Sequence, residues 1–350
     1  RLGRRSLQFL ARRTFLQDAG PRIVTSTTTD PYFNKSMEDY LFEHAKGSGP
    51  LLFLWQNDNT VFIGRNQNPW KECNIQEMEK DNVNLVRRFS GGGAVYQDLG
   101  NLCWSLFEHK DSHKAKNNLE MICKAVPFAA EVSGRNDITI DSRKISGSAF
   151  KFAKNYALHH GTLLVDVNLD NMLKYLNVNK EKLKSKGVAS VKSRVINLKE
   201  LDNSITIESV SDSLKEAFQE KHGQAQMIQL NHELVNLWDM NEFNSVLHKM
   251  KDWNWRFGHS PKFDHNIEHR FDWGIMDLHV SSNNGHITDV KLFSDSLYPE
   301  MIESITEQLN GAQYHQDGIE NALGLAMYHH NDPTIIKQIS EYKDWLKKSL

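Results

Sequence analysis

The stretch that most constrains this chain is RRFSGGGAVYQDLGN, from Arg87 to Asn101. Three consecutive glycines, Gly91–Gly93, follow two arginines, and a strand-like run begins at Ala94. Glycine has no Cβ, so such a loop lets backbone N–H groups approach an oxyanion and takes positive φ at little steric cost. No Gly-Lys-Ser/Thr follows, and no helix does either, so the loop is neither a Walker A loop nor a dinucleotide fingerprint. A simple turn beside two solvated arginines is the alternative.

Length and composition narrow the class of protein. The 350 residues give room for one large and one small domain. The net charge of −2 supplies no basic field for nucleic acid, and no apolar run reaches the roughly 18 residues of a membrane helix. The three cysteines, Cys73, Cys103 and Cys123, are too few and too widely spaced for a disulfide scaffold or a zinc module. A reducing compartment is therefore expected.

The first 20 residues differ from the rest of the chain. They contain five arginines, no lysine and one acid, Asp18, with leucines and phenylalanines between the charges. This composition is typical of a mitochondrial transit segment, and a disordered basic tail is the alternative. We expect residues 1–20 to lie outside the fold and the protein to reach the mitochondrial matrix. A cytoplasmic location is the alternative.

From Arg22 onward, strand-like and helix-like segments alternate, which predicts a mixed α/β domain. The expected strands lie at 22–29, 51–56, 60–64, 83–89, 102–107 and 157–167, and the expected helices at 34–45, 118–132 and 207–223. Asp30-Pro31 predicts a turn, and Asn57-Asp58-Asn59 between two apolar runs predicts a β-hairpin. Residues 224–250 have mixed character and are the candidate link to a second domain.

A new pattern begins after residue 250. Alternating runs on either side of Asn283-Asn284-Gly285 predict a hairpin, and helices are expected at 301–309, 319–327 and 333–350. A hairpin with helices over about 100 residues predicts a small α+β domain.

His265, Glu268 and His269 match the H-x-x-E-H pattern of some zinc proteases. That chemistry needs both histidines on one face of a helix. A period-2 strand begins by Phe271, so we expect no zinc site here and no structural metal elsewhere.

A lysine stands within the second of two strand-like pieces, DITI and RKISGSA, that flank Asp141-Ser142. This residue, Lys144, precedes Ser146-Gly147-Ser148. Small neighbours leave room for a lysine to project into a ligand cavity. A lysine that faces water from an edge strand is the alternative.

Several motifs in this order resemble the lipoate–protein ligase A family. They run from about Arg22 to the C-terminus: DPYFN, GRNQNPWKECN, RRFSGGGAVYQDLGN, GRND, RKISGSA, HHGTLL, KGVASVKSRVINL and WNWRFG. The resemblance is closer to bacterial two-step ligases than to animal lipoyltransferases. It implies a large catalytic domain (21–245) of mixed α and β structure, with a core shared with biotin ligases and class II synthetases. It also implies a small C-terminal domain (250–350) that moves during the reaction.

The resemblance implies a reaction in two halves. Lipoate attacks ATP to give lipoyl-AMP, and a lysine of an acceptor lipoyl domain then takes the lipoyl group. Lys144 matches the family's central lysine, which contacts both lipoate and ATP. The remaining assignments place ATP on Arg87, Gly92, Gly93, Ala94 and Val95, with Arg88, Asn136, Asp137 and Gly161 as secondary candidates. Mg²⁺ is expected with ATP, and a lysine-rich loop at Lys186 and Lys192 is a candidate cover for the adenylate.

One position departs from the family pattern. Gln97 stands where family members carry a histidine, and glutamine cannot carry a proton at neutral pH. A lipoyltransferase that uses preformed lipoyl-AMP and a non-catalytic lipoyl-domain binding module therefore stay open as alternatives. An octanoyltransferase with a nucleophilic cysteine is disfavoured, because neither Cys73 nor Cys103 has an identifiable histidine partner.

The resemblance also implies the partners. These are apo lipoyl domains of the E2 subunits of 2-oxoacid dehydrogenases and the H protein of glycine cleavage. We expect a monomer, and no nucleic acid or membrane partner.

Overall fold

The computed structural model describes residues 20–45, 49–134, 136–153, 155–177, 194–230, 241–257, 265–283, 285–314 and 316–349. These residues form two compact units. The first unit comprises the described residues up to 62 with 70–87 and 94–256, and the second comprises 63–69, 88–93 and 257–350. No helix in these ranges is both long enough and apolar enough to span a bilayer. The expected domain boundary near 245–250 stays a prediction.

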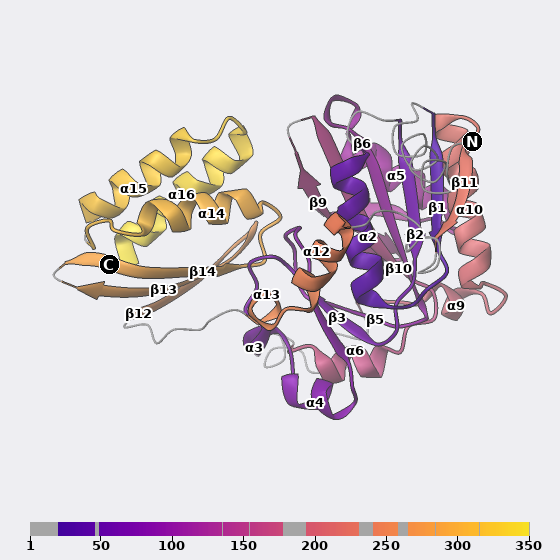
Figure 1. Ribbon diagram of the computed structural model, residues 1–350, viewed down its shortest axis with the longest axis horizontal. Coiled ribbons are helices and arrows are strands. Elements are labelled where there is room, and N and C mark those ends of the chain that lie inside the picture. Colours follow the sequence, from indigo (N-terminus) through magenta and orange to yellow (C-terminus); the bar gives the residue numbers. More distant parts are fainter. Residues whose placement is uncertain are drawn as a thin grey trace, which may run out of the picture. The chain divides into compact units, whose positions relative to one another are not determined.

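An eight-stranded mixed sheet forms the centre of the first unit, in the order β11-β1-β2-β6-β10-β9-β8-β7 (Figure 1). Its strands are β1 (Arg22–Ser26), β2 (Leu51–Trp55), β6 (Asn101–His109), β7 (Glu131–Ser133), β8 (Asp137–Ile140), β9 (Arg143–Phe152), β10 (Tyr156–Leu164) and β11 (Gln226–Leu230). Strand β1 pairs in parallel with β2 and β11, and the pairs from β2 to β7 are antiparallel. The predicted mixed α and β fold is confirmed.

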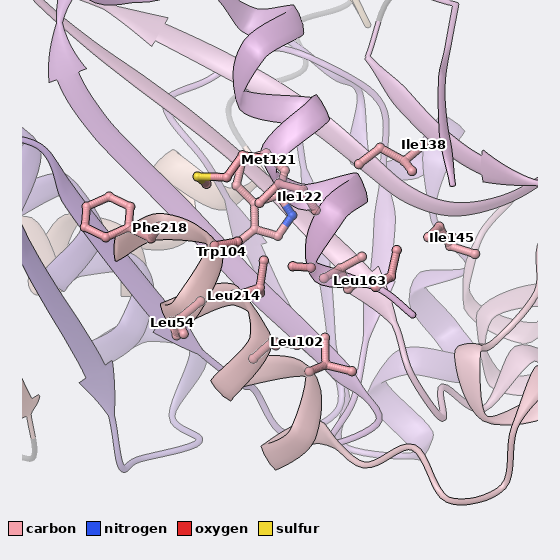
Figure 2. Packing of buried hydrophobic residues seen from close by; sticks show 14 of the residues in the cluster. Leu54, Leu102, Trp104, Met121, Ile122, Ile138, Ile145, Leu163, Leu214 and Phe218 are labelled. Carbon is pink, nitrogen blue, oxygen red and sulfur yellow. The ribbon is translucent and has the colours of Figure 1, made fainter. Parts of the chain in front are cut away.

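The two faces of this sheet carry different chemistry. Trp104 of β6 lies in an apolar core with α5 (Ala115–Ala125) and α10 (Ile207–His222), and Met121 and Phe218 of these helices belong to the same buried cluster (Figure 2). The next residue, Ser105, donates from Oγ to Glu38 Oε1 on α2 (Pro31–His44) at 2.5 Å. Successive strand residues point to opposite faces. Helix α2 therefore covers the face opposite α5 and α10 (Figure 1).

Shorter elements complete the first unit. A small sheet has the order β4-β3-β5. The remaining bounds are β3 (Thr60–Ile63), β4 (Asn84–Arg87), β5 (Val95–Gln97), α3 (Pro69–Glu72), α4 (Ile75–Lys80), η1 (Lys110–Ser112), α6 (Leu169–Tyr175), α9 (Leu198–Leu201), α12 (Asn241–Lys251) and α13 (Trp253–Arg256).

The two predicted strand-like pieces around Asp141-Ser142 are β8 and β9, which pair as a hairpin. Its two-residue turn, Asp141-Ser142, has φ values of 49° and 61°, as a type I′ turn requires. A bulge then interrupts the pairing, because Ile138 lies opposite Ser146 and Thr139 lies opposite Lys144. The extra residue, Ile145, packs into the core (Figure 2).

The second unit is an α+β structure, as predicted for the C-terminal part. Its sheet has the order β12-β13-β14, and a single apolar core joins that sheet to three helices. The bounds are β12 (His265–Phe271), β13 (Gly274–Asn283), β14 (His286–Ser294), α14 (Pro299–Leu309), α15 (Gln316–Tyr328) and α16 (Pro333–Ser349). The predicted hairpin joins β13 to β14, with Gly285 at a φ of 75°.

Three local predictions were wrong. Asp30-Pro31 begins helix α2, because the Asp30 carboxylate accepts from the amides of Tyr32 and Phe33 and proline suits the first helical turn. Strands β2 and β3 form no hairpin, because β2 is buried along its length between β1 and β6. The expected link at 224–250 contains β11, which extends the main sheet beside β1.

Candidate active site

Lys144 lies beside the bulge in β9, paired with one acid. Its Nζ is 2.8 Å from Asp137 Oδ1, and the two side chains are 38 % and 36 % exposed. A Cβ at position 147 would lie 2.8 Å from the same Nζ, so Gly147 provides the space for the ammonium group. The backbone of Lys144 also bonds to the chain after residue 193, through Arg194 O and Ile196 N. The site thus holds a charged, solvent-accessible ammonium group in a defined place.

The turn before β8 is tied to β9. Asn136 O accepts from Ser148 N at 2.9 Å and from Ser148 Oγ at 3.0 Å. The Asn136 side-chain amide donates to Ser148 O. His159 Nε2 lies 3.0 Å from Ser148 Oγ. These contacts hold Asn136 and Asp137 next to Lys144.

Gly161 of β10 is required by packing. It lies opposite Ser148 in the sheet, and a Cβ there would lie 2.5 Å from the Trp104 ring and 2.8 Å from Gly147 O. Four predicted residues, Lys144, Asn136, Asp137 and Gly161, are therefore brought together by β8, β9 and β10.

Arg87, at the end of β4, is held by α13. Its Nε donates to Trp255 O at 2.8 Å and its Nη2 donates to Arg256 O at 2.8 Å. The Trp255 indole donates in return to Arg87 O at 2.9 Å. Burial lowers the pKa of the guanidinium to about 10, which leaves it charged at neutral pH. Its assignment to ATP stays a prediction.

Arg88 and the glycine loop belong to the second unit. The Arg88 guanidinium donates to Gly91 O at 2.8 Å and to Gly93 O at 2.7 Å, which fixes the carbonyls of the loop. Gly92 has a φ of 93°, and its N–H donates to Ser296 O at 3.1 Å. A Cβ at Gly91 would lie 2.1 Å from Ser296 O. Positive φ thus accounts for Gly92 and close packing for Gly91, whereas a Cβ at Gly93 would meet nothing within 4 Å. Nucleotide binding by the loop stays a prediction.

Ala94 and Val95 continue from the loop into the first unit. Val95 begins β5 and pairs with Phe62 of β3. The role of both residues as ATP contacts stays a prediction.

Sequence reasoning missed a buried polar network on α2. Glu38 is fully buried, and its Oε1 lies 2.5 Å from Ser105 Oγ and 2.7 Å from His160 Nδ1. Lys35 Nζ lies 2.7 Å from Glu38 Oε2 and 2.5 Å from Asp39 Oδ2. Burial alone would raise the pKa of Glu38, but His160 and Lys35 together lower it below its ordinary value. The i, i+3 and i+4 spacing from Lys35 was the signal available in the sequence.

Gln97 has a structural role in this molecule. It is buried, and its Oε1 accepts from Asn57 Nδ2 at 2.6 Å and from Cys103 Sγ at 3.2 Å. Burial raises the pKa of Cys103 well above its ordinary value and that of Cys73 to about 12. Neither thiol is activated as a nucleophile.

Two other predictions concern segments outside this site. His265 and His269 lie on strand β12, so they do not share a helical face. Lys186 and Lys192, the candidate adenylate cover, lie outside the described residues. Their role stays a prediction.

Comparison with known protein families gives two consecutive matches. The lipoyl protein ligase A/B catalytic domain matches residues 30–219, and the bacterial lipoate protein ligase C-terminus matches residues 260–342. A lipoate-protein ligase A of Psychrobacter cryohalolentis is 41% identical over 93% of this chain and 97% of its own length. A lipoate-protein ligase A of Blochmanniella floridana is 39% identical over 86% of this chain and 91% of its own.

Solved structures agree with these matches. P. falciparum LipL1, in complex with lipoate, has a TM-score of 0.82 at 31% identity and covers 94% of this chain and 100% of its own. A bi-partite lipoate protein ligase from Thermoplasma acidophilum, studied with its E2 lipoyl domain, has a TM-score of 0.61 at 25% identity. The match covers 70% of this chain and 99% of the Thermoplasma chain. A lipoate-protein ligase A bound with ATP shares the fold, with a TM-score of 0.58 at 23% identity. The match covers 68% of this chain and 99% of the ATP-bound ligase.

Proposed function

Because the chain belongs to the lipoate–protein ligase A family, we propose that it activates lipoate with ATP and transfers the lipoyl group to protein. In the first step a lipoate carboxylate oxygen bonds to the α-phosphorus of ATP, and pyrophosphate leaves. In the second, the ε-amine of an acceptor lysine attacks the lipoyl carbonyl, loses a proton and releases AMP. Both steps concentrate negative charge at one phosphate, so fixed cations should contribute most of the catalysis.

The observation that carries this proposal is the solvent exposure and ion pairing of Lys144. Its side chain is 38 % exposed, and among the described residues its ammonium group has one acidic partner, Asp137, at 2.8 Å. Substrate oxygens can therefore replace or join Asp137 as its partners without the burial of a new charge. We assign Lys144 the role of a bridge between the lipoate carboxylate and the α-phosphate, where it offsets their repulsion.

The residues also fit ATP with Mg²⁺. Magnesium prefers oxygen ligands and is commonly held by one or two carboxylates together with the substrate phosphates. Asp137 offers such a carboxylate beside Lys144, and no cluster of three metal-ligating side chains exists in the described ranges. Asp137 would hold the cation, which neutralises phosphate charge when bound. The ATP-bound structure of a ligase with this fold supports the nucleotide assignment.

We further propose apo lipoyl domains as acceptors, from E2 subunits of 2-oxoacid dehydrogenases and from the glycine-cleavage H protein. The Thermoplasma ligase and its E2 lipoyl domain support the first of these. The arginine-rich residues 1–20 support a mitochondrial matrix location, with a cytoplasmic one as the alternative. A reporter fused to this segment would enter mitochondria if the location is right and stay outside if it is wrong.

The test uses protein without residues 1–20, Mg-ATP and lipoate, with an apo lipoyl domain in a second tube. We expect pyrophosphate and lipoyl-AMP in the first tube and a lipoylated domain in the second. Modification only from supplied lipoyl-AMP would show a lipoyltransferase, and Gln97→His would then be the first variant to make. Failure of both reactions would leave a lipoyl-domain binding module.

A further inference from the structure

We infer that Ser148 and His159 are positioning residues for adenylation, which hold Asn136 and Asp137 in place from the sheet face opposite α2. The inference rests on the proposed function and concerns residues that none of the assignments above includes. It follows from four hydrogen-bond contacts and from the packing of one buried histidine.

Ser148 and Asn136 form a closed pair across the start of the β8–β9 hairpin. Ser148 N and Ser148 Oγ both donate to Asn136 O, at 2.9 Å and 3.0 Å, and Asn136 Nδ2 donates back to Ser148 O. Asp137 is the next residue and pairs with Gly147. The backbone that carries the Asp137 carboxylate is thus fixed by Ser148.

The direction of the hydrogen bonds at Ser148 determines which ring nitrogen of His159 carries a proton. A carbonyl oxygen only accepts, so the Ser148 hydroxyl proton points to Asn136 O. His159 Nε2, at 3.0 Å from that hydroxyl, must then carry the proton and donate it. Its Nδ1 is buried without a hydrogen-bond partner among the described residues, which fits the unprotonated nitrogen of a neutral ring.

The surroundings keep the ring neutral and in place. Burial, with smaller contributions from His113, His160 and Lys221, lowers the pKa of His159 well below its ordinary value. Trp104 meets the ring edge-on with centroids 5.0 Å apart, and Phe150 lies at 4.6 Å. His159 pairs with Phe150 in the sheet, whereas His160 reaches Glu38 of α2, so His159 lies on the other face. A neutral donor locked in this way is suited to orientation and not to proton transfer.

Ser148→Ala and His159→Leu test the inference through the kinetics of adenylation. Each should lower kcat for lipoyl-AMP formation about tenfold or more, because small displacements of site groups cost large factors in rate. The KM for lipoate should stay unchanged. His159→Gln keeps an amide donor near the Nε2 position and should retain activity within about threefold. Ser211→Ala, at a buried serine of α10, is the matched control and should behave as wild type.

A double-mutant cycle with Asp137→Asn separates positioning from general destabilisation. If Ser148 acts through Asp137, Ser148→Ala should add little to the loss that Asp137→Asn already causes. The inference would be overturned if the losses of kcat from Ser148→Ala and Asp137→Asn multiplied in the double variant. It would also be overturned if His159→Gln lost as much activity as His159→Leu. If Ser148→Ala does not fold, the contrast between the two His159 variants decides alone. Inactive wild-type protein would instead refute the proposed function.

Discussion

Lys35 and Lys144 are two paired lysines of the same unit, and their surroundings differ. The Lys35 side chain is 2 % exposed and has two carboxylates within 2.7 Å, whereas Lys144 is 38 % exposed and has one at 2.8 Å. Burial opposes the charge on Lys35, but Asp39 and Glu38 outweigh it and raise its pKa. Ion pairing is therefore common to both lysines, and access to solvent is what separates them.

The difference assigns the two lysines to different tasks. A buried charge that loses its partner costs several kcal/mol, so Lys35 cannot exchange partners during a reaction cycle. An exposed pair contributes little to stability, so Lys144 can turn from Asp137 to a substrate. Four measurements test whether the two lysines differ in this way.

Lys35→Ala should have the largest effect, on stability. It leaves Glu38 and Asp39 buried with less compensation, and we expect the free energy of unfolding to fall by about 3–5 kcal/mol. Urea denaturation at pH 7 measures this. Lys116→Ala is the control, since Lys116 is exposed and only distantly paired with Glu120, and should change stability by less than about 0.5 kcal/mol. A loss below about 1 kcal/mol for Lys35→Ala would remove the distinction between the two lysines.

Lys144→Ala should act on chemistry and leave the fold intact. We expect lipoyl-AMP formation to fall by about 100- to 1000-fold, the usual loss when one fixed charge-stabilising donor is removed. Pyrophosphate release measures it. Lys199→Ala is the matched control, because Lys199 is similarly exposed and is paired with Asp166 at 2.6 Å. Normal adenylation by Lys144→Ala would refute the assigned role.

The pH dependence of stability should separate the buried network from the exposed pair. The pKa of Glu38 in the folded protein lies below its ordinary value of 4.5. Its ion pairs therefore add to the free energy of unfolding above pH 4.5, and this contribution is lost progressively as the pH falls below 4.5. The stability difference between wild type and Glu38→Gln should therefore shrink between about pH 5 and pH 3, as urea titrations at several pH values would show. A difference that stayed constant over this range would contradict the pairing.

Asp137→Asn should have the smallest effect on stability. An exposed ion pair contributes about 0–1 kcal/mol, so the midpoint of thermal unfolding should hardly move. Calorimetry measures this, with Asp166→Asn, which breaks the exposed pair with Lys199, as the control. A large loss would mean that Lys144 is held as firmly as Lys35.

Local patterns in the sequence were enough to predict the strands that carry the candidate site. The strand-like pieces on either side of Asp141-Ser142 were predicted and are strands β8 and β9, of which β9 carries Lys144, and Asn136 and Asp137 lie within the same short stretch. The spacing of these residues left Lys144 open between a ligand cavity and solvent, and the resemblance to the ligase family is what assigned it to the site.

The remaining features depend on contacts between distant residues. Glu38 forms hydrogen bonds with Ser105 and His160, which lie 67 and 122 residues away in the sequence. Arg87 forms one with Trp255, 168 residues away. Such contacts follow from the order of strands in the sheet. The hairpin wrongly expected between β2 and β3 shows that local turn signals do not determine that order.

The Asp141-Ser142 turn has a consequence for protein engineering. Both residues adopt left-handed φ values of 49° and 61°, which asparagine and glycine tolerate better. Cross-strand pairing must therefore hold this hairpin against the preferences of its own turn residues. An Asn-Gly turn would relieve that conflict without altering a side chain of the site. The turn thus offers a place to raise the thermal stability of the protein close to Lys144.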